Sequence, residues 1–256
     1  MIDAARQPWR EVRRIARTGS TNADLLALAE QGEASGLVLV ALEQSDGRGR
    51  LGRSWQSPPD AGLTFSVLLR SRRPVADLGP VPLLTGLAIV RTVDEIGGPL
   101  TFLKWPNDVM IADATNGDRK LAGVLAQHSP TDALVVGIGL NTGMTADQRP
   151  IPAATSLLLE GVKAKGRDHD VLLAGLLGHL ADLLAPLIAG EPWPADVLEE
   201  YRARCLTIGV NVRVQRTASD HLEGMAVGID ASGALLVQAE DGVMTTVTAG
   251  DVLHVR

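Results

Sequence analysis

The feature that most constrains the fold is a glycine- and arginine-rich stretch, Glu43 to Trp55, which follows an apolar run typical of a buried strand, Leu37 to Leu42. Its three glycines, Gly47, Gly49 and Gly52, match the G-x-G-x-x-G pattern of dinucleotide-binding folds. That fold requires the loop to open a helix whose N-terminus holds a pyrophosphate. The continuation Arg-Ser-Trp-Gln-Ser-Pro-Pro cannot start a helix, so we exclude a doubly wound nucleotide-binding fold at this stretch.

The composition of the same stretch indicates that it binds anions. Glycine lets a backbone approach a ligand closely, and the forked donors of arginine match carboxylate and phosphate oxygens. Two plainer interpretations remain open at this point, a solvated basic loop and an arginine-rich contact with nucleic acid. The rest of the chain has to distinguish them.

Length and composition narrow the class of protein. The chain of 256 residues is long enough for one large domain and a small one, and its formal net charge of −6 offers nucleic acid no broad attractive field. The single cysteine, Cys205, excludes an internal disulfide framework, and the five histidines show no spacing for a structural zinc site. The N-terminus lacks the apolar core of a signal peptide, and the apolar runs are shorter than a membrane span. We therefore expect a cytoplasmic protein with no membrane or DNA partner.

Polar residues gather at the start of the first predicted helix. Gly19-Ser20-Thr21-Asn22 precedes a helical segment, Ala23 to Gly32, which Ser20 or Thr21 can cap and Gly32 can end. One explanation of Ser20, Thr21 and Asn22 is helix capping alone. The same hydroxyl and amide groups can also hydrogen-bond a polar part of a ligand.

Three further polar positions lie at bends or ends of predicted strands. The strand-like segment Phe102 to Ile111 is interrupted by a proline, which predicts a bend that presents Lys104, Asn107 and Asp108. Lys120 opens the next strand, in which Gly123 marks a close approach of backbone or ligand. Another buried strand, residues 134 to 141, ends at Asn141.

The chain changes character near residue 207. The segments 63–69, 80–96, 171–187 and 195–206 are predicted scaffold, a strand and three helices. From Val210 onward, five short alternating segments are separated by tight-turn signals, including Ser232-Gly233 and Asp241-Gly242, and predict a small β-barrel. We therefore expect an α+β protein with a large domain, residues 1–206, and a barrel, residues 207–256.

Taken together, the motifs resemble the biotin protein ligases. The shared motifs, in order, are Gly-Ser-Thr-Asn, Glu-Gln-Ser-Asp-Gly-Arg-Gly-Arg-Leu-Gly-Arg-Ser-Trp, Lys-Trp-Pro-Asn-Asp, Arg-Lys-Leu-Ala-Gly and Gly-Ile-Gly-Leu-Asn. The resemblance covers residues 18 to 145 closely and the C-terminal segment loosely. It implies a mixed-sheet catalytic domain of the biotin/lipoate ligase type with an SH3-like C-terminal barrel. It also implies an enzyme that activates biotin with ATP and Mg²⁺ to biotinyl-5′-AMP and transfers biotin to a lysine of a biotin carboxyl carrier domain.

The resemblance also implies roles for single residues. The polar end of biotin is assigned to Ser20, Thr21, Asn22 and Gln44, and the loop over biotin and the adenylate to Gly47, Arg48, Gly49 and Arg50. Lys120, with room provided by Gly123, is expected to hold the biotin carboxylate and the α-phosphate, so that Lys120, Arg48 and Arg50 form the catalytic set. The nucleotide side is assigned to Arg50, Arg53, Trp55, Lys104, Asn107 and Asn141, with Asp108 as the magnesium ligand.

The chain departs from the family pattern at Asp46, where many members carry a small neutral residue; this adds a negative charge beside the anion site. Too little sequence precedes the first motif for the DNA-binding domain of the repressor branch, so we expect a monofunctional ligase, either monomeric or homodimeric. A lipoate-protein ligase of the same fold is the nearest alternative. An octanoyl transferase needs a cysteine nucleophile, and Cys205 lies outside the motif region.

Overall fold

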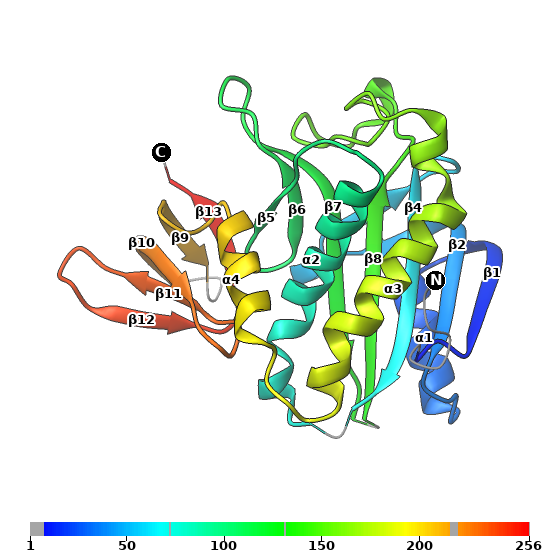
Figure 1. Cartoon of the computed structure of the whole chain (residues 1–256), viewed down its shortest axis with the longest axis horizontal. Helices are drawn as coiled ribbons and strands as arrows, with labels where there is room; N and C mark the ends of the chain where they lie inside the picture. Colours follow the sequence, from blue (N-terminus) through cyan, green and yellow to red (C-terminus); the bar gives the residue numbers. More distant parts are fainter. Residues whose placement is uncertain (1–7, 72, 131, 216–219, 256) are drawn as a thin grey trace.

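The computed structural model describes residues 8–255 except 72, 131 and 216–219, and within these residues the chain forms two sheets with helices packed on the larger one (Figure 1). The larger sheet has eight strands in the order β1-β2-β4-β8-β7-β6-β5, with β3 paired to β2. Its strands are β1 Glu11–Thr18, β2 Leu37–Arg48, β3 Ser54–Ser57, β4 Gly62–Arg70, β5 Phe102–Lys104, β6 Asp108–Ile111, β7 Arg119–His128 and β8 Ala133–Asn141. Among the strands that the structure describes in this sheet, only β1 and β2 pair in parallel, which confirms the predicted mixed sheet.

The two faces of this sheet differ because side chains alternate along each strand. On β4 and β8, Phe65, Val67, Val136 and Ile138 are fully or almost fully buried in the main core. The opposite face carries small residues at the facing pairs Thr64–Gly139 and Ser66–Gly137. One face therefore has the bulk to pack helices, while the other leaves space above its centre.

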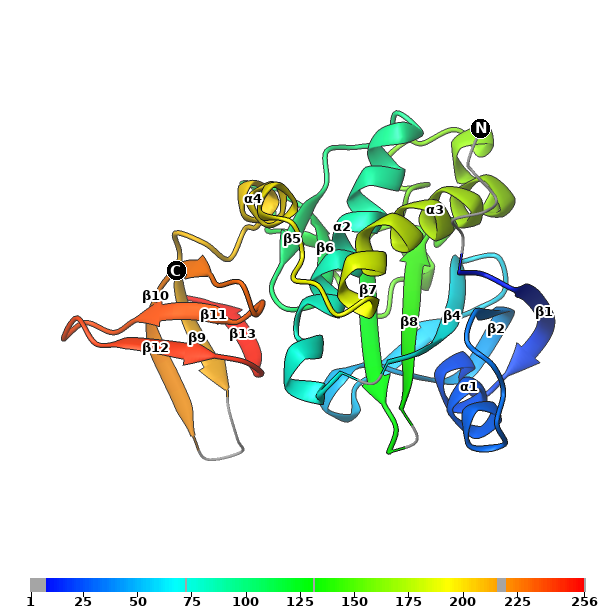
Figure 2. The same cartoon turned by 60° about the horizontal axis from the view of Figure 1, so that its bottom comes forward.

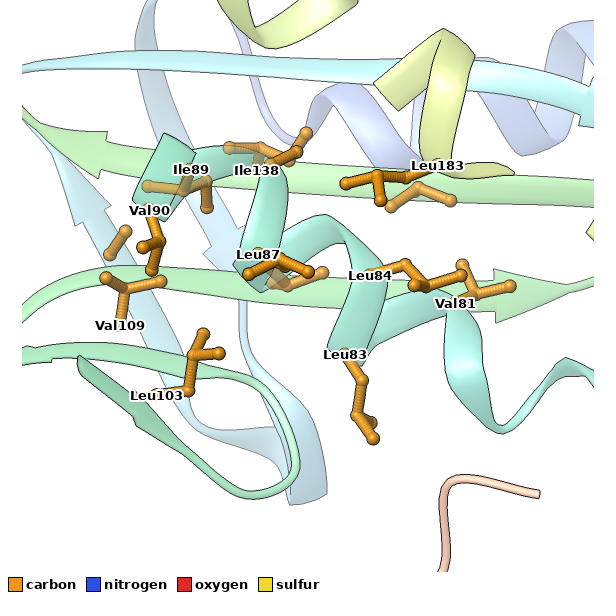
Figure 3. Packing of buried hydrophobic residues seen from close by; sticks show 14 of the residues in the cluster. Val81, Leu83, Leu84, Leu87, Ile89, Val90, Leu103, Val109, Ile138 and Leu183 are labelled. Carbon is orange, nitrogen blue, oxygen red and sulfur yellow. The ribbon is translucent and has the colours of Figure 1, made fainter. Parts of the chain in front are cut away.

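Two long helices cover the bulky face. Helix α2, Pro80–Glu95, and helix α3, His169–Ile188, lie side by side across the sheet (Figures 1 and 2). Figure 3 shows Leu84 and Leu87 of α2 along the sheet, with Ile138 of β8 and Leu183 of α3 in the same layer. The helical segments Val75–Glu95, which includes α2, and His169–Ile188 are long and apolar enough by composition to cross a membrane. Because their apolar residues pack on the sheet and on each other, we interpret them as core helices.

Helix α1, Thr21–Glu30, packs on the opposite face against β4 and β8. Ser20 caps it by accepting a hydrogen bond from the backbone N–H of Ala23 at 3.4 Å, and Gly32 follows its end with φ of +89°. Its apolar side covers only one end of that face, where Leu25 meets Leu68 and Val135. The N-terminus of α1 is thereby placed beside the small residues at the centre of the sheet.

Helix α4, Ala195–Arg204, leads into a five-stranded antiparallel sheet with the order β12-β11-β10-β9-β13. Its strands are β9 Asn211–Gln215, β10 His221–Ile229, β11 Leu235–Gln238, β12 Met244–Val247 and β13 Asp251–His254. This small all-β domain confirms the C-terminal prediction, whereas closure into a barrel and the boundary at residue 207 stay predictions. Buried residues of this sheet, such as Val212 and Ile229, belong to the same apolar cluster as residues of the larger sheet, such as Phe65.

The structure differs from the prediction at three strands. Residues 11–18, for which no element was predicted, form the edge strand β1; Arg13 pairs with Glu11 of the same strand, and Arg14 pairs with Asp170 of α3. The stretch expected as a glycine-arginine loop is extended at both ends, because β2 continues to Arg48 and β3 returns from Ser54. Only residues 49–53 form the connecting turn, in which Leu51 adopts φ of +54°.

Candidate active site

A cavity of about 890 Å³ lies over the small-residue face of the large sheet. Its walls come from the N-terminus of α1, the β2–β3 hairpin, the β5–β6 hairpin and strand β13 of the C-terminal domain. It is lined by the predicted residues Ser20, Thr21, Asn22, Gln44, Arg48, Gly49, Arg50, Arg53, Trp55, Lys104, Asn107, Asp108, Lys120, Gly123 and Asn141. Segments separated by more than 100 residues therefore meet at one site.

Gly47 is the predicted residue that does not line this cavity; it lines a second hollow between the hairpin and residues 125–127 of β7. It pairs with Trp55 across β2 and β3, and a Cβ at Gly47 would lie 2.3 Å from the Trp55 carbonyl oxygen. The glycine thus allows the two strands to approach. The local geometry explains Gly47 without a ligand contact.

Hydrogen-bonding side chains occupy one end of the cavity, which we call the polar pole: Thr21, Asn22 and Gln44, with Ser66 and Gln127 behind them. The Gln44 Oε1 atom accepts from the Thr21 backbone N–H at 2.8 Å and lies 3.0 Å from the Thr21 hydroxyl. The Asn22 Nδ2 atom donates to the Leu125 carbonyl at 3.1 Å and to the Gln127 Oε1 at 2.8 Å. Sequence reasoning missed Ser66 and Gln127, although a serine and a threonine two residues apart in an apolar strand indicate a polar face.

Five basic side chains also line the cavity, and we call this set the cationic pole: Arg48, Arg50, Arg53, Lys104 and Lys120. Lys120 Nζ lies 2.6 Å from Asp108 Oδ1 and 5.6 Å from the centre of the Trp55 ring. A Cβ at Gly123 would lie 3.1 Å from both Lys120 Nζ and the Trp55 ring, so the glycine gives the lysine its room. A Cβ at Gly139 would lie 2.3 Å from the Trp55 ring, so the missing side chain at this second glycine leaves space for the indole.

The three arginines at this pole differ in burial. Arg48 is exposed and pairs with Asp46 at 3.0 Å. Arg50 is more enclosed: it donates to the Gly250 carbonyl at 3.1 Å, its Nε is buried without a hydrogen-bond partner among the described residues, and burial lowers its pKa. Arg53 forms an ion pair with Asp251 of the C-terminal domain. The hairpin is therefore tied to the C-terminal domain at two points, Gly250 and Asp251.

Amide groups brace the strands that carry these charges. Asn107 donates from Nδ2 to the Val124 carbonyl at 2.8 Å, and Asn141 donates to the Thr155 carbonyl at 2.9 Å. The backbone of Lys120 is held in the same way, because its N–H donates to Ala153 at 2.7 Å and its carbonyl accepts from Thr155 at 2.9 Å. These contacts fix the direction from which Lys120 enters the cavity.

The C-terminal domain contributes a wall that the sequence did not predict, Asp251 to His254. His254 is half-buried, with Nε2 3.3 Å from the Thr207 hydroxyl. Burial lowers its pKa below the ordinary value, and the nearby Lys104 lowers it further. Short alternating strands predict such a sheet, but they do not indicate which of its edges meets the other domain.

Comparisons with known proteins agree with this geometry. Residues 14–141 match the biotin/lipoate A/B protein ligase family, and residues 207–255 match the biotin protein ligase C-terminal domain. The chain is 40% identical to a biotin–[acetyl-CoA-carboxylase] ligase of Mycobacterium tuberculosis, with 97% of this chain and 90% of that protein covered. It is 32% identical to the ligase of the same name from Paracoccus denitrificans, with 89% and 94% covered.

A solved structure shows the same fold. The biotin protein ligase from Aquifex aeolicus in complex with biotin and ATP superposes with a TM-score of 0.77 at 29% identity, and covers 97% of this chain and 100% of that one. Sequence and fold thus agree over nearly the whole chain. We conclude that the chain belongs to the biotin protein ligase family of ATP-dependent enzymes.

Proposed function

We propose that this enzyme activates biotin with MgATP to biotinyl-5′-AMP and then transfers biotin to a lysine of the biotin carboxyl carrier domain of a carboxylase. The single observation that carries the proposal is one cavity lined both by the neutral hydrogen-bonding side chains of the polar pole and by five basic side chains. Biotin has a polar, uncharged ring system at one end and a carboxylate at the other. A single bound orientation therefore satisfies both poles.

The cationic pole suits the first half-reaction. A carboxylate oxygen of biotin attacks the α-phosphorus of ATP, and pyrophosphate leaves with the bonding electrons. Lys120, Arg48 and Arg50 offset the repulsion between the two anions and stabilise the charge that develops on phosphorus. Gly49 leaves the backbone open where the hairpin closes over the adenylate. In the second half-reaction the neutral amine of the acceptor lysine attacks the biotinyl carbonyl carbon, and AMP leaves.

Asp108 is the proposed magnesium ligand, and its surroundings fit this role. Its Oδ1 atom is buried without a well-oriented hydrogen bond, although the Lys120 ammonium lies 2.6 Å away. The described residues contain no cluster of three or more His, Cys, Asp or Glu that could hold a metal. A cation bound by one carboxylate and the nucleotide phosphates agrees with that donor set. Magnesium neutralises phosphate charge when it is bound.

We assign the nucleotide to the same end. Trp55 offers a ring face, Asn107 and Asn141 offer amide groups, and Lys104 and Arg53 offer charges for phosphate oxygens. Asp251 to His254 complete this side, so the C-terminal domain takes part in nucleotide binding. We further expect a cytoplasmic enzyme that does not bind DNA, with residues 1–206 as its catalytic domain.

Lipoate-protein ligase remains the alternative, because the matched family covers both activities. The polar pole favours biotin: a cyclic urea can use its fixed donors and acceptors, whereas a dithiolane ring cannot.

The experiment is to incubate the protein with ATP, Mg²⁺ and either acid, and to follow pyrophosphate release together with the acid-labile adenylate by mass spectrometry. Release with biotin and not with lipoate is expected, and the reverse result refutes the assignment. Retention on heparin at low salt would favour the nucleic-acid interpretation instead.

A further inference from the structure

A side chain that does not line the cavity, Ser66, hydrogen-bonds two residues of the polar pole from behind. Ser66 of β4 is completely buried beneath Thr21 and Asn22. Its hydroxyl oxygen lies 2.6 Å from Asn22 Oδ1 and 2.7 Å from the Thr21 hydroxyl oxygen. One buried hydroxyl therefore connects the two side chains that face the ligand.

These contacts determine which way the Asn22 amide points. Its nitrogen faces the Leu125 carbonyl, which can only accept, so the amide cannot be rotated without placing two oxygens against each other. Its oxygen then accepts the Ser66 proton and keeps a second lone pair. Asn22 thus presents an acceptor of fixed direction.

Gln44 is oriented by the same network. Its oxygen accepts the Thr21 backbone N–H, a donor that cannot reverse its role, so its nitrogen is the end left for a ligand. Ser66 gives its only proton to Asn22, so the single proton of the Thr21 hydroxyl has two acceptors within reach, Gln44 Oε1 at 3.0 Å and the Ser66 oxygen at 2.7 Å. Thr21 therefore links Ser66 to Gln44, while the Thr21 backbone N–H keeps the Gln44 oxygen facing α1.

A glycine in the neighbouring strand also makes room for the Asn22 side chain. Gly137 of β8 lies opposite Ser66 in the sheet, and a Cβ at Gly137 would lie 2.1 Å from Asn22 Oδ1. The Asn22 amide occupies the place of a missing side chain. Ser66 and Gly137, neighbours across two strands, hold it from two sides.

We propose that Ser66 is a positioning residue which, with Gly137 and Gln127, presets the acceptor on Asn22 and, through Thr21, supports the donor on Gln44 for a cyclic urea, and so selects biotin over acids with an apolar ring. This inference rests on the proposed function and adds the residues that create its selectivity. A urea carbonyl accepts from Gln44, and a urea N–H donates to Asn22. A ring without polar atoms leaves both groups buried without a hydrogen-bond partner, and this lowers the binding free energy of such a ligand.

The test compares Michaelis constants for the two substrates. Ser66→Ala is expected to raise the KM for biotin by about 10- to 100-fold, because the Asn22 oxygen loses its buried donor and the Thr21 hydroxyl loses its buried partner. The KM for ATP and the kcat at saturating biotin should stay within about threefold, since the cationic pole is untouched. The ratio of kcat/KM for biotin to that for lipoate should fall by a similar factor. Equal rises in both KM values, or an unchanged biotin KM, overturn the proposal.

Two matched variants protect this test against a folding defect. Gln127→Ala removes only a partly buried partner of Asn22 and should raise the biotin KM by about three- to tenfold. Gly137→Ala displaces Asn22 and should raise the biotin KM, whereas Gly139→Ala, two residues along, displaces Trp55 and should raise the ATP KM. Biotin KM values unchanged in both Gln127→Ala and Gly137→Ala contradict the inference. Adenylate formation by the wild-type enzyme is measured first, so failure of the proposed function is recognised separately.

Discussion

The two poles of the cavity are built in opposite ways. At the polar pole, Thr21 and Asn22 are 2% and 5% exposed and bond to one another through neighbouring side chains. At the cationic pole, the side chains of Arg48 and Arg53 are 63% and 60% exposed and form ion pairs near the surface. One pole is internally paired and buried, while the other is charged and open.

This difference agrees with the ligand groups that the proposed function assigns to each pole. A neutral ring gains little from long-range attraction, so its recognition depends on donors and acceptors held in fixed directions. A triphosphate and a carboxylate attract cations over a distance. The basic side chains that bind them must first separate from the acidic side chains with which they form ion pairs in the ligand-free protein. The ion pair of Lys120 with Asp108 and that of Arg48 with Asp46 are such exchangeable partners. The predictions below test this contrast.

The largest effect is expected at Lys120. Lys120→Ala should lower adenylate formation by about 10³-fold, because it removes the charge that lies beside Asp108 at the reacting centre. Pyrophosphate exchange measures this, and the biotin KM should change far less. Lys165→Ala, at an exposed lysine of the segment Ala164–Arg167, is the control and should retain full activity. A loss of less than tenfold in Lys120→Ala would place the reacting atoms elsewhere.

Asp108 should come next. Asp108→Asn keeps the side-chain size but removes the charge proposed for magnesium, so exchange should fall roughly 100-fold and the midpoint of a Mg²⁺ titration should rise. The effect should exceed that of Asp46→Asn, a matched change at an exposed carboxylate of the same pole. If the Mg²⁺ midpoint of Asp108→Asn equals that of the wild type, Asp108 serves only to hold Lys120.

Much of the fold could be predicted from sequence because its elements bury regular apolar patterns. The core strand at residues 63–69 and the helices near 80–96 and 171–187 lie where periodicity placed them. β1 was missed because an edge strand exposes half its residues, and its arginines pair with acids that are distant in sequence, such as Asp170. β3 was missed because its four residues are defined by pairing with β2 rather than by their own pattern.

The residues of the candidate site also fall into a predicted group and a group that the sequence did not reveal. Sequence motifs brought out the residues that face the cavity, because the resemblance depends on them. Ser66 and Gln127 act from behind other residues, and His254 and Asp251 reach the cavity only through the packing of the C-terminal sheet. Such residues become visible only when strand register and domain contacts are known.

A smaller effect is expected where the hairpin meets the C-terminal domain. Asp251→Asn and Arg53→Ala should each raise the ATP KM by about two- to fivefold, since the ion pair is largely exposed. The double variant should lose no more than the stronger single variant, because both changes break one contact. Fully additive effects in this double-mutant cycle would show that the two residues act separately, and the biotin KM serves as the internal control.

The smallest effect is a dependence on pH. It distinguishes the two poles, because none of the five described residues that define the polar pole has an ionisable side chain. Burial lowers the folded-state pKa of His254 below its ordinary value of 6.5, with Lys104 adding to the shift and Asp118 opposing it. Between the folded and unfolded pKa values the unfolded chain binds a proton that the folded chain does not. The stabilisation is therefore fully present above pH 6.5 and is lost as the pH falls through that window.

His169 is the matched control for this titration. Burial lowers its pKa in the same direction, and it hydrogen-bonds Thr142 rather than lining the cavity. His254→Gln and His169→Gln should each reduce the fall in Tm between pH 7.5 and 5.5 by about 1–2 °C in differential scanning calorimetry. Only His254→Gln should also flatten the rise in ATP affinity at low pH, because a protonated His254 adds charge where the nucleotide phosphates are expected. If both variants change the pH dependence of ATP binding equally, His254 has no special place at the cationic pole.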